Sequence, residues 1–87
     1  MDLETRQVNG KIIEIRGCIR DVQATPVHGV RVQSSFSQHE ISTDKDGNYT
    51  IMAHEDEWLI FSKVGYVTQK QDIQSRKQIS IQFVKGE

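Results

Sequence analysis

The sequence has few of the features that assign a chain to a functional class at once. It has a single cysteine, Cys18, among its 87 residues, which excludes an intrachain disulfide. Its 11 basic and 12 acidic residues give a net charge of −1, which argues against a nucleic-acid-binding protein. No apolar run approaches the roughly 20 residues that cross a bilayer, and residues 1–6 lack the apolar core of a secretion signal.

The composition indicates one small globular domain. Hydrophobic residues make up 36% of the chain and charged residues 26%, which is far from the balance of a disordered segment. A chain of this length buries only about 60–65% of its unfolded surface, so we expect a thin core. We assign residues 11–87 to the domain and residues 1–10 to a polar N-terminal lead-in.

The strongest pattern along the chain is an alternation of apolar and polar residues. Ile13, Ile15 and Ile19 alternate mostly with charged neighbours, and Ile79, Ile81 and Phe83 alternate with uncharged polar neighbours near the C-terminus. A period of two predicts strands with one face in the core and one in water. The run at residues 58–61 is continuously apolar, and this favours a central strand buried on both faces.

Turn signals separate these runs, the strongest being the DKDGN segment at residues 44–48, which predicts a β-hairpin. Short strands at regular spacing predict an all-β, seven-stranded sandwich of two sheets with almost no helix. The expected strands are residues 11–20, 29–35, 39–43, 48–53, 58–64, 67–73 and 77–84.

Four segments occur in an order that is typical of a known family. They are residues 15–21 (IRGCIRD), 25–32 (TPVHGVRV), 42–49 (STDKDGNY) and 59–68 (LIFSKVGYVT). The chain resembles the carboxypeptidase regulatory-like domain, a transthyretin-like or prealbumin-like sandwich, over residues 12–84. The dipeptide at residues 23–24 differs from the family's usual Asn-Gly turn, so the resemblance predicts the fold but not the shape of that loop.

The resemblance implies a Greek-key sandwich whose motif residues preserve shape rather than chemistry. Glycines would supply sharp turns, and the turn at residues 44–48 would direct Tyr49 into the core. The structural motif residues are Pro26, Gly29, Asp44, Asp46, Gly47, Tyr49, Gly65 and Tyr66. No catalytic residue, no cofactor and no metal are expected.

The resemblance also implies a function, namely a non-catalytic accessory or interaction module. Such modules accompany metallocarboxypeptidases, precede the plug of TonB-dependent outer-membrane receptors in Bacteroidetes, or decorate surface proteins. We therefore expect a protein partner or a larger parent chain, in the periplasm or at the cell surface, and no membrane insertion by this domain. A small hydrolase of a purine-related substrate is the least favoured alternative, because the chain lacks that group's C-terminal Tyr-Arg-Gly-Ser-type tail.

A calcium loop is the sharpest chemical alternative. Asp44, Asp46 and Asn48 have the spacing of oxygen ligands, and Glu55 falls at the twelfth position counted from Asp44. An EF-hand loop needs glycine at its sixth position, where this chain has Tyr49. A simple hairpin turn is the favoured interpretation.

Other reactive residues give weaker signals. The spacing of the three histidines, His28, His39 and His54, matches no zinc motif, so we expect loop or surface positions. Cys18 lies on the face opposite Ile15 and has no partner motif that would make it a nucleophile. The acidic residues 55–57 are expected to form a solvated hairpin tip.

The aromatic residues bear on a second function, a carbohydrate-binding module of the starch-binding type. Sugar binding requires exposed aromatic platforms, and only Phe36 and Tyr66 are expected to lie free. Trp58 opens the most apolar run, so we expect it to anchor the core; the alternative is a strand-edge position stacked on a sugar ring.

Overall fold

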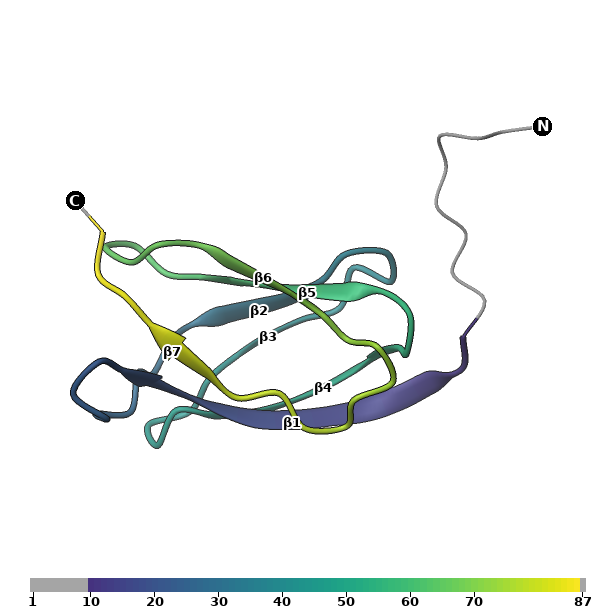
Figure 1. The fold of residues 1–87 in the computed structure, drawn as a ribbon, viewed down its shortest axis with the longest axis horizontal. Coiled ribbons are helices and arrows are strands. Elements are labelled where there is room, and N and C mark those ends of the chain that lie inside the picture. The colour runs from purple at the N-terminus through teal and green to yellow at the C-terminus, as the bar shows by residue number, and fades with distance from the viewer. Residues whose placement is uncertain (1–9, 87) are drawn as a thin grey trace.

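The structure, a computed structural model, describes residues 10–86. Within them the chain forms seven strands and no helix (Figure 1). The prediction of an all-β, two-sheet sandwich is confirmed, and each strand lies within a few residues of its expected position. The strands are β1 (Ile12–Asp21), β2 (Arg31–Ser34), β3 (Glu40–Ser42), β4 (Asn48–His54), β5 (Trp58–Ser62), β6 (Gln69–Asp72) and β7 (Ile81–Phe83).

The predicted lead-in at residues 1–10 lies outside the described residues, apart from Gly10. The backbone N–H of Gly10 donates to Asp56 Oδ2 at 3.1 Å, so the described chain begins in contact with the turn that follows β4. Across residues 10–86, no helix has the length and apolar character needed to cross a membrane.

The seven strands divide between two sheets that lie face to face (Figure 1). One sheet has the order β4-β1-β7, and the other has the order β3-β2-β5-β6. Strand β1 is the centre of its sheet, because its first part pairs antiparallel with β4 and its last three residues pair in parallel with β7. All neighbours in the four-stranded sheet are antiparallel.

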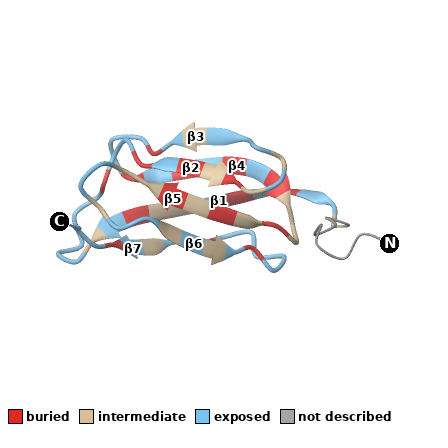
Figure 2. Ribbon diagram, turned by 90° about the horizontal axis from the view of Figure 1, so that it is seen from above, coloured by how far each residue is buried: buried red, intermediate tan, exposed pale blue. Residues whose placement is uncertain are grey.

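The core fills the space between the sheets and follows the predicted alternation. In β1, Ile13, Ile15 and Ile19 are buried, whereas Glu14 and Arg16 between them are exposed. Figure 2 shows the buried positions as bands along β1, β2, β4 and β5. The other buried hydrophobic residues are Val27, Val30, Val32, Tyr49, Ile51, Ala53, Leu59, Phe61, Ile73, Ile79 and Phe83.

Gly17 marks the point where β1 meets the segment that leads into β7. The N–H of Ile79 donates to the carbonyl oxygen of Arg16 at 2.9 Å, which brings the two backbones together. A Cβ atom on Gly17 would lie 1.8 Å from the carbonyl oxygen of Ile79. That oxygen accepts a hydrogen bond from the Tyr49 hydroxyl at 2.6 Å. A side chain at position 17 would therefore displace the segment and break this bond.

The prediction that residues 58–61 are buried on both faces is wrong. Leu59 and Phe61 are fully buried, but Trp58 and Ile60 are only partly buried on the outer face of the four-stranded sheet. Lys70 on β6 places its Nζ atom 4.6 Å from the centroid of the Trp58 ring. The Trp58 ring thus packs against the Lys70 ammonium group on the outer face and not in the core between the sheets. The prediction that Trp58 anchors the core is therefore also wrong.

Two turns expected to close hairpins instead cross between the sheets. The turn at residues 44–48 connects β3 to β4, which belong to different sheets, and residues 55–57 likewise connect β4 to β5. The hairpins within one sheet are β2–β3 and β5–β6. Local turn chemistry reverses the chain direction, but the choice of pairing partner depends on distant strands.

Candidate functional site

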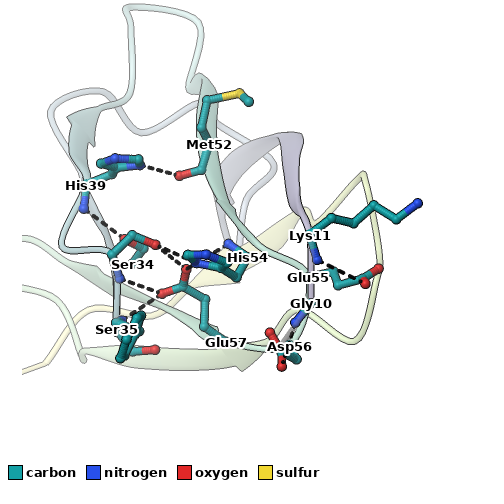
Figure 3. Close-up of polar contacts among 12 residues, drawn as sticks. Gly10, Lys11, Ser34, Ser35, His39, Met52, His54, Glu55, Asp56 and Glu57 are labelled. Carbon is teal, nitrogen blue, oxygen red and sulfur yellow. Dashed lines mark hydrogen bonds and ion pairs between the residues drawn. The ribbon is translucent and has the colours of Figure 1, made fainter. Parts of the chain in front are cut away.

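Glu57 is a buried carboxylate at the turn that enters β5, with a side chain 1% exposed. The prediction that residues 55–57 form a solvated tip is therefore wrong for this residue. Its carboxylate accepts hydrogen bonds from the backbone N–H groups of Phe36 at 2.6 Å, Ser37 at 3.1 Å and His54 at 2.7 Å. The Ser37 hydroxyl also donates to it. The turn is drawn in Figure 3, with Glu57 beside His54.

These contacts set the charge state of Glu57. Burial alone would raise the pKa of the carboxyl group, because it removes the charged form from water. The hydrogen bonds from the Ser37 hydroxyl and from the backbone N–H groups of His54, Phe36 and Ser37 outweigh burial and lower the pKa to about 2. Glu57 is thus ionised at neutral pH, and its charge is stabilised by hydrogen-bond donors from the β2–β3 loop and the end of β4.

Ser37, His54 and Glu57 are the residue types of a hydrolytic triad, but they have a different geometry. In a triad the acid and the nucleophile contact different nitrogens of the imidazole ring. Here Ser37 Oγ and Glu57 Oε2 both lie 3.2 Å from the same nitrogen, His54 Nδ1. The Ser37 hydroxyl also contacts the carboxylate directly. This cluster fastens the β2–β3 loop to the end of β4 and does not present an activated nucleophile.

The other two histidines, His28 and His39, lie apart from this cluster and form hydrogen bonds with different segments of the chain. His39, an exposed residue just before β3, donates from Nδ1 to the carbonyl oxygen of Met52 on β4 at 2.7 Å (Figure 3). His28 is exposed, and its carbonyl oxygen accepts a hydrogen bond from Lys63 Nζ at 2.9 Å. His54 is the last residue of β4 and not a loop residue as expected. Among residues 10–86, no three His, Cys, Asp or Glu side chains gather as metal ligands would.

The oxygens expected to form the alternative calcium loop do not converge. Asp44 Oδ1 accepts hydrogen bonds from the N–H groups of Asp46 and Asn48, both at 2.9 Å, so it closes its own turn. Glu55 lies beyond the other end of β4, about 20 Å of strand away, where it accepts from Lys11 N–H and from the Ser75 hydroxyl. The seven-residue strand β4 keeps Glu55 apart from the turn.

Three predicted motif glycines have backbones in the left-handed region. The φ angles of Gly29, Gly47 and Gly65 are +74°, +77° and +91°. Gly47 combines this conformation with tight packing, since a Cβ atom there would lie 2.5 Å from the carbonyl oxygen of Ile19. A Cβ atom on Gly65 would have no neighbour within 4 Å. The two positions thus need glycine for partly different reasons.

The aromatic motif residues lie in or against the core. Tyr49 is buried and contacts Phe61 edge to face, with ring centroids 5.7 Å apart. Burial raises the pKa of its phenol group far above the usual value. Tyr66 is partly buried and stacks on Phe83 at 5.2 Å, so the expectation that it lies free is wrong. Pro26 forms an isolated bridge with Arg20 beside the Gly47 turn.

Cys18 lies on the outer face of β1 and is partly buried. Its backbone N–H donates to the Ser80 hydroxyl at 3.1 Å, which supports the junction between β1 and the segment before β7.

Three residues that hold loops or strand junctions in place were not predicted from the sequence. They are Glu57, Gly17 and Thr43, whose buried hydroxyl accepts from Val30 N–H and donates to the carbonyl oxygen of Val27. The sequence does indicate a role for Gly17, because a glycine inside an alternating strand predicts that another backbone approaches closely. The sequence gives no such indication for Glu57, because this residue ends a run of three acidic residues and such a run is typical of a solvated turn.

Three exposed valines belong to segments that meet at one end of the sandwich, namely the β1–β2 turn, the β5–β6 turn and the last described residues (Figure 1). Val22, Val67 and Val84 have exposed fractions of 62%, 49% and 45%. Val22 and Val84 line the same hollow, and Val67 N–H donates to the carbonyl oxygen of Val84 at 2.9 Å. We call these residues the valine row.

Seven strands in two facing sheets, with turns held by buried side chains, define a two-sheet β-sandwich domain. The chain matches the family model of the CarboxypepD_reg-like domain over residues 15–87, and it belongs to this family. The predicted resemblance is thereby confirmed. Domains of this family are typically non-catalytic β-sandwich modules. A search of curated proteins finds no match to the chain.

Proposed function

We propose that this domain is an interaction module, joined to or working beside an outer-membrane receptor, a peptidase or a surface protein in the periplasm or at the cell surface. The valine row is the observation that carries the proposal. A contiguous group of exposed apolar side chains on a small domain marks a surface that gains free energy when another surface covers it. Membership of a family of accessory sandwiches supports the same conclusion.

The experiment is site-specific photo-crosslinking in the producing cells. A photoreactive phenylalanine analogue is placed at Val22 or Val84, and at Thr50, an exposed residue of β4, as the matched control. We expect the two valine positions to yield the same crosslinked protein or neighbouring domain, and Thr50 not to yield it. The product should also disappear when Val67→Asp is added. Crosslinks that are equal at all three positions would contradict the proposal.

A carbohydrate-binding function is the second candidate, because Phe36 remains exposed as expected. Its side chain is 56% exposed and contacts the His54 ring edge to face, with centroids 5.9 Å apart. The ring is thus held against the Glu57 cluster while more than half of the side chain is exposed to solvent, as a sugar platform requires. Titration with oligosaccharides, followed by nuclear magnetic resonance of the Phe36 ring, tests this function. Unchanged ring signals at millimolar glycan would exclude it.

A further inference from the structure

The two sheets differ in how far the outward backbone groups of their edge strands have hydrogen-bond partners. In the three-stranded sheet, side chains occupy three outward positions of the β4 edge: Asp44 accepts from Asn48 N–H, His39 donates to the Met52 carbonyl oxygen and Glu57 accepts from His54 N–H. The β7 edge is closed on the other side, since Gln69 Nε2 donates to the carbonyl oxygen of Gln82 at 2.7 Å. Val67 N–H and Gly86 N–H close the segment that follows β7. Capped edges of this kind oppose the addition of another strand.

Strand β6 at the edge of the four-stranded sheet is more open. Ile73 N–H donates to the carbonyl oxygen of Glu57, and the register then directs the backbone groups of Gln71 and Gln69 toward β5. The backbone groups of Lys70 and Asp72 consequently point away from the sheet. Of these, only the carbonyl oxygen of Asp72 has a hydrogen-bond partner within residues 10–86, the exposed Arg76 guanidinium.

The side chains of β6 are self-complementary in charge. Lys70 and Asp72 are both exposed, and they lie on the same face because they are two residues apart. In an antiparallel pair of β6 strands with its two-fold axis at Gln71, Lys70 of each copy faces Asp72 of the other. The same residues carry the outward backbone groups, so each Lys70–Asp72 pair can also exchange two hydrogen bonds across the axis.

The other open edge, β3, does not have this property. Its Glu40 and Ser42 backbone groups point outward, but a two-fold axis at Ile41 places Glu40 opposite Ser42. Glu40 is already paired with Arg31 at 3.0 Å. Charge complementarity therefore favours β6 over β3.

We propose that the β6 edge pairs antiparallel with β6 of a second copy of this domain, which continues the four-stranded sheet across a two-fold axis. Opposite charges that lie directly across a strand pair stabilise it, and the symmetric contact satisfies both edges at once. Lys70 then lies between the Trp58 ring of its own copy and Asp72 of the second copy. This proposal does not depend on the valine row, which lies at the end of the sandwich.

The test is analytical ultracentrifugation from micromolar to millimolar protein. We expect a reversible dimer for the wild-type domain, and association weakened at least about tenfold in Lys70→Asp and in Asp72→Lys, because each variant places like charges opposite each other. An equimolar mixture of these two variants restores every opposite-charge pair, so we expect it to dimerise as the wild type does. Glu40→Lys on β3 is the matched control and should dimerise normally.

Circular dichroism checks that each variant retains its sheet content. A wild-type domain that stays monomeric at millimolar concentration would overturn the proposal. A dimer that both single charge reversals leave intact, a variant mixture that stays monomeric, or a dimer lost in Glu40→Lys would overturn it equally.

Discussion

The backbone N–H of Phe36 donates to Glu57 Oε1 at 2.6 Å, and this bond joins the turn that enters β5 to the loop between β2 and β3. Phe36 precedes β3 in the four-stranded sheet, and Glu57 lies in the turn by which the chain returns to that sheet from β4. Because the carboxylate is buried and accepts several donors, its loss leaves more than one backbone N–H group without a partner. The domain's response to acid follows from this arrangement.

We expect Glu57 to make the domain sensitive to acid. Its pKa is lowered from 4.5 to about 2 on folding, so it stabilises the folded state fully above pH 4.5 and ceases to do so as the pH falls through about 2. The contribution amounts to at most about 3 kcal/mol. Urea denaturation of wild type and Glu57→Gln should therefore show a stability difference at neutral pH that shrinks near pH 2. Glu14→Gln, an exposed control, should show no such trend.

Gly17→Ala should destabilise the domain by about 2–4 kcal/mol, since the new methyl group overlaps the Ile79 carbonyl oxygen and the backbone must move. Gly86→Ala is the control, because the nearest atom to its Cβ would be 3.3 Å away. Equilibrium denaturation measures both variants. Equal stability of the two would show that the β1–Ile79 contact is looser than described.

Gly47→Val and Gly65→Val separate backbone strain from packing. Both place a branched side chain at positive φ, which costs about 1–3 kcal/mol. Only at position 47 does the new side chain also meet the Ile19 carbonyl oxygen, so we expect Gly47→Val to lose about 1–2 kcal/mol more. Urea melts decide the order, and a larger loss at Gly65 would contradict this account.

The fluorescence of Trp58 should show a partly exposed indole. We expect emission to the red of a core tryptophan and clear quenching by iodide, since the ring lies on the outer face of the sheet. The Lys70 ammonium attracts the anion, so Lys70→Gln should reduce quenching by iodide while leaving quenching by neutral acrylamide nearly unchanged. Blue-shifted emission that resists both quenchers would show instead that Trp58 is buried in the core.

Millimolar calcium should leave the melting temperature unchanged. A ligand that binds the folded state raises the melting temperature by mass action, and the oxygens of Asp44 and Glu55 are too far apart to share an ion. Differential scanning calorimetry with calcium, and then with a chelator, tests this expectation. A rise of several degrees in the melting temperature with calcium, reversed by the chelator, would show that the calcium-loop interpretation is correct.

Much of the architecture follows from local pattern. The alternation around Ile15 predicts the face of β1 that enters the core, and turn residues such as Gly47 predict where the chain reverses. The candidate surface is less predictable. Val22, Val67 and Val84 are far apart in sequence, and no local pattern indicates that three segments bring them together.

The sequence by itself determined that this chain forms short strands with one buried face, because side chains alternate along a strand whatever its partner is. Only the tertiary structure decided which strands pair. The pairing in turn decided that Trp58 is partly exposed and that Glu57 is buried. Trp58 lies outside because β5 has its inner face set by Leu59 and Phe61, and a two-layer sandwich places nothing over the other face. Glu57 is buried because a distant loop supplies the donors that compensate its charge, and such donors are specified by the fold and not by neighbouring residues.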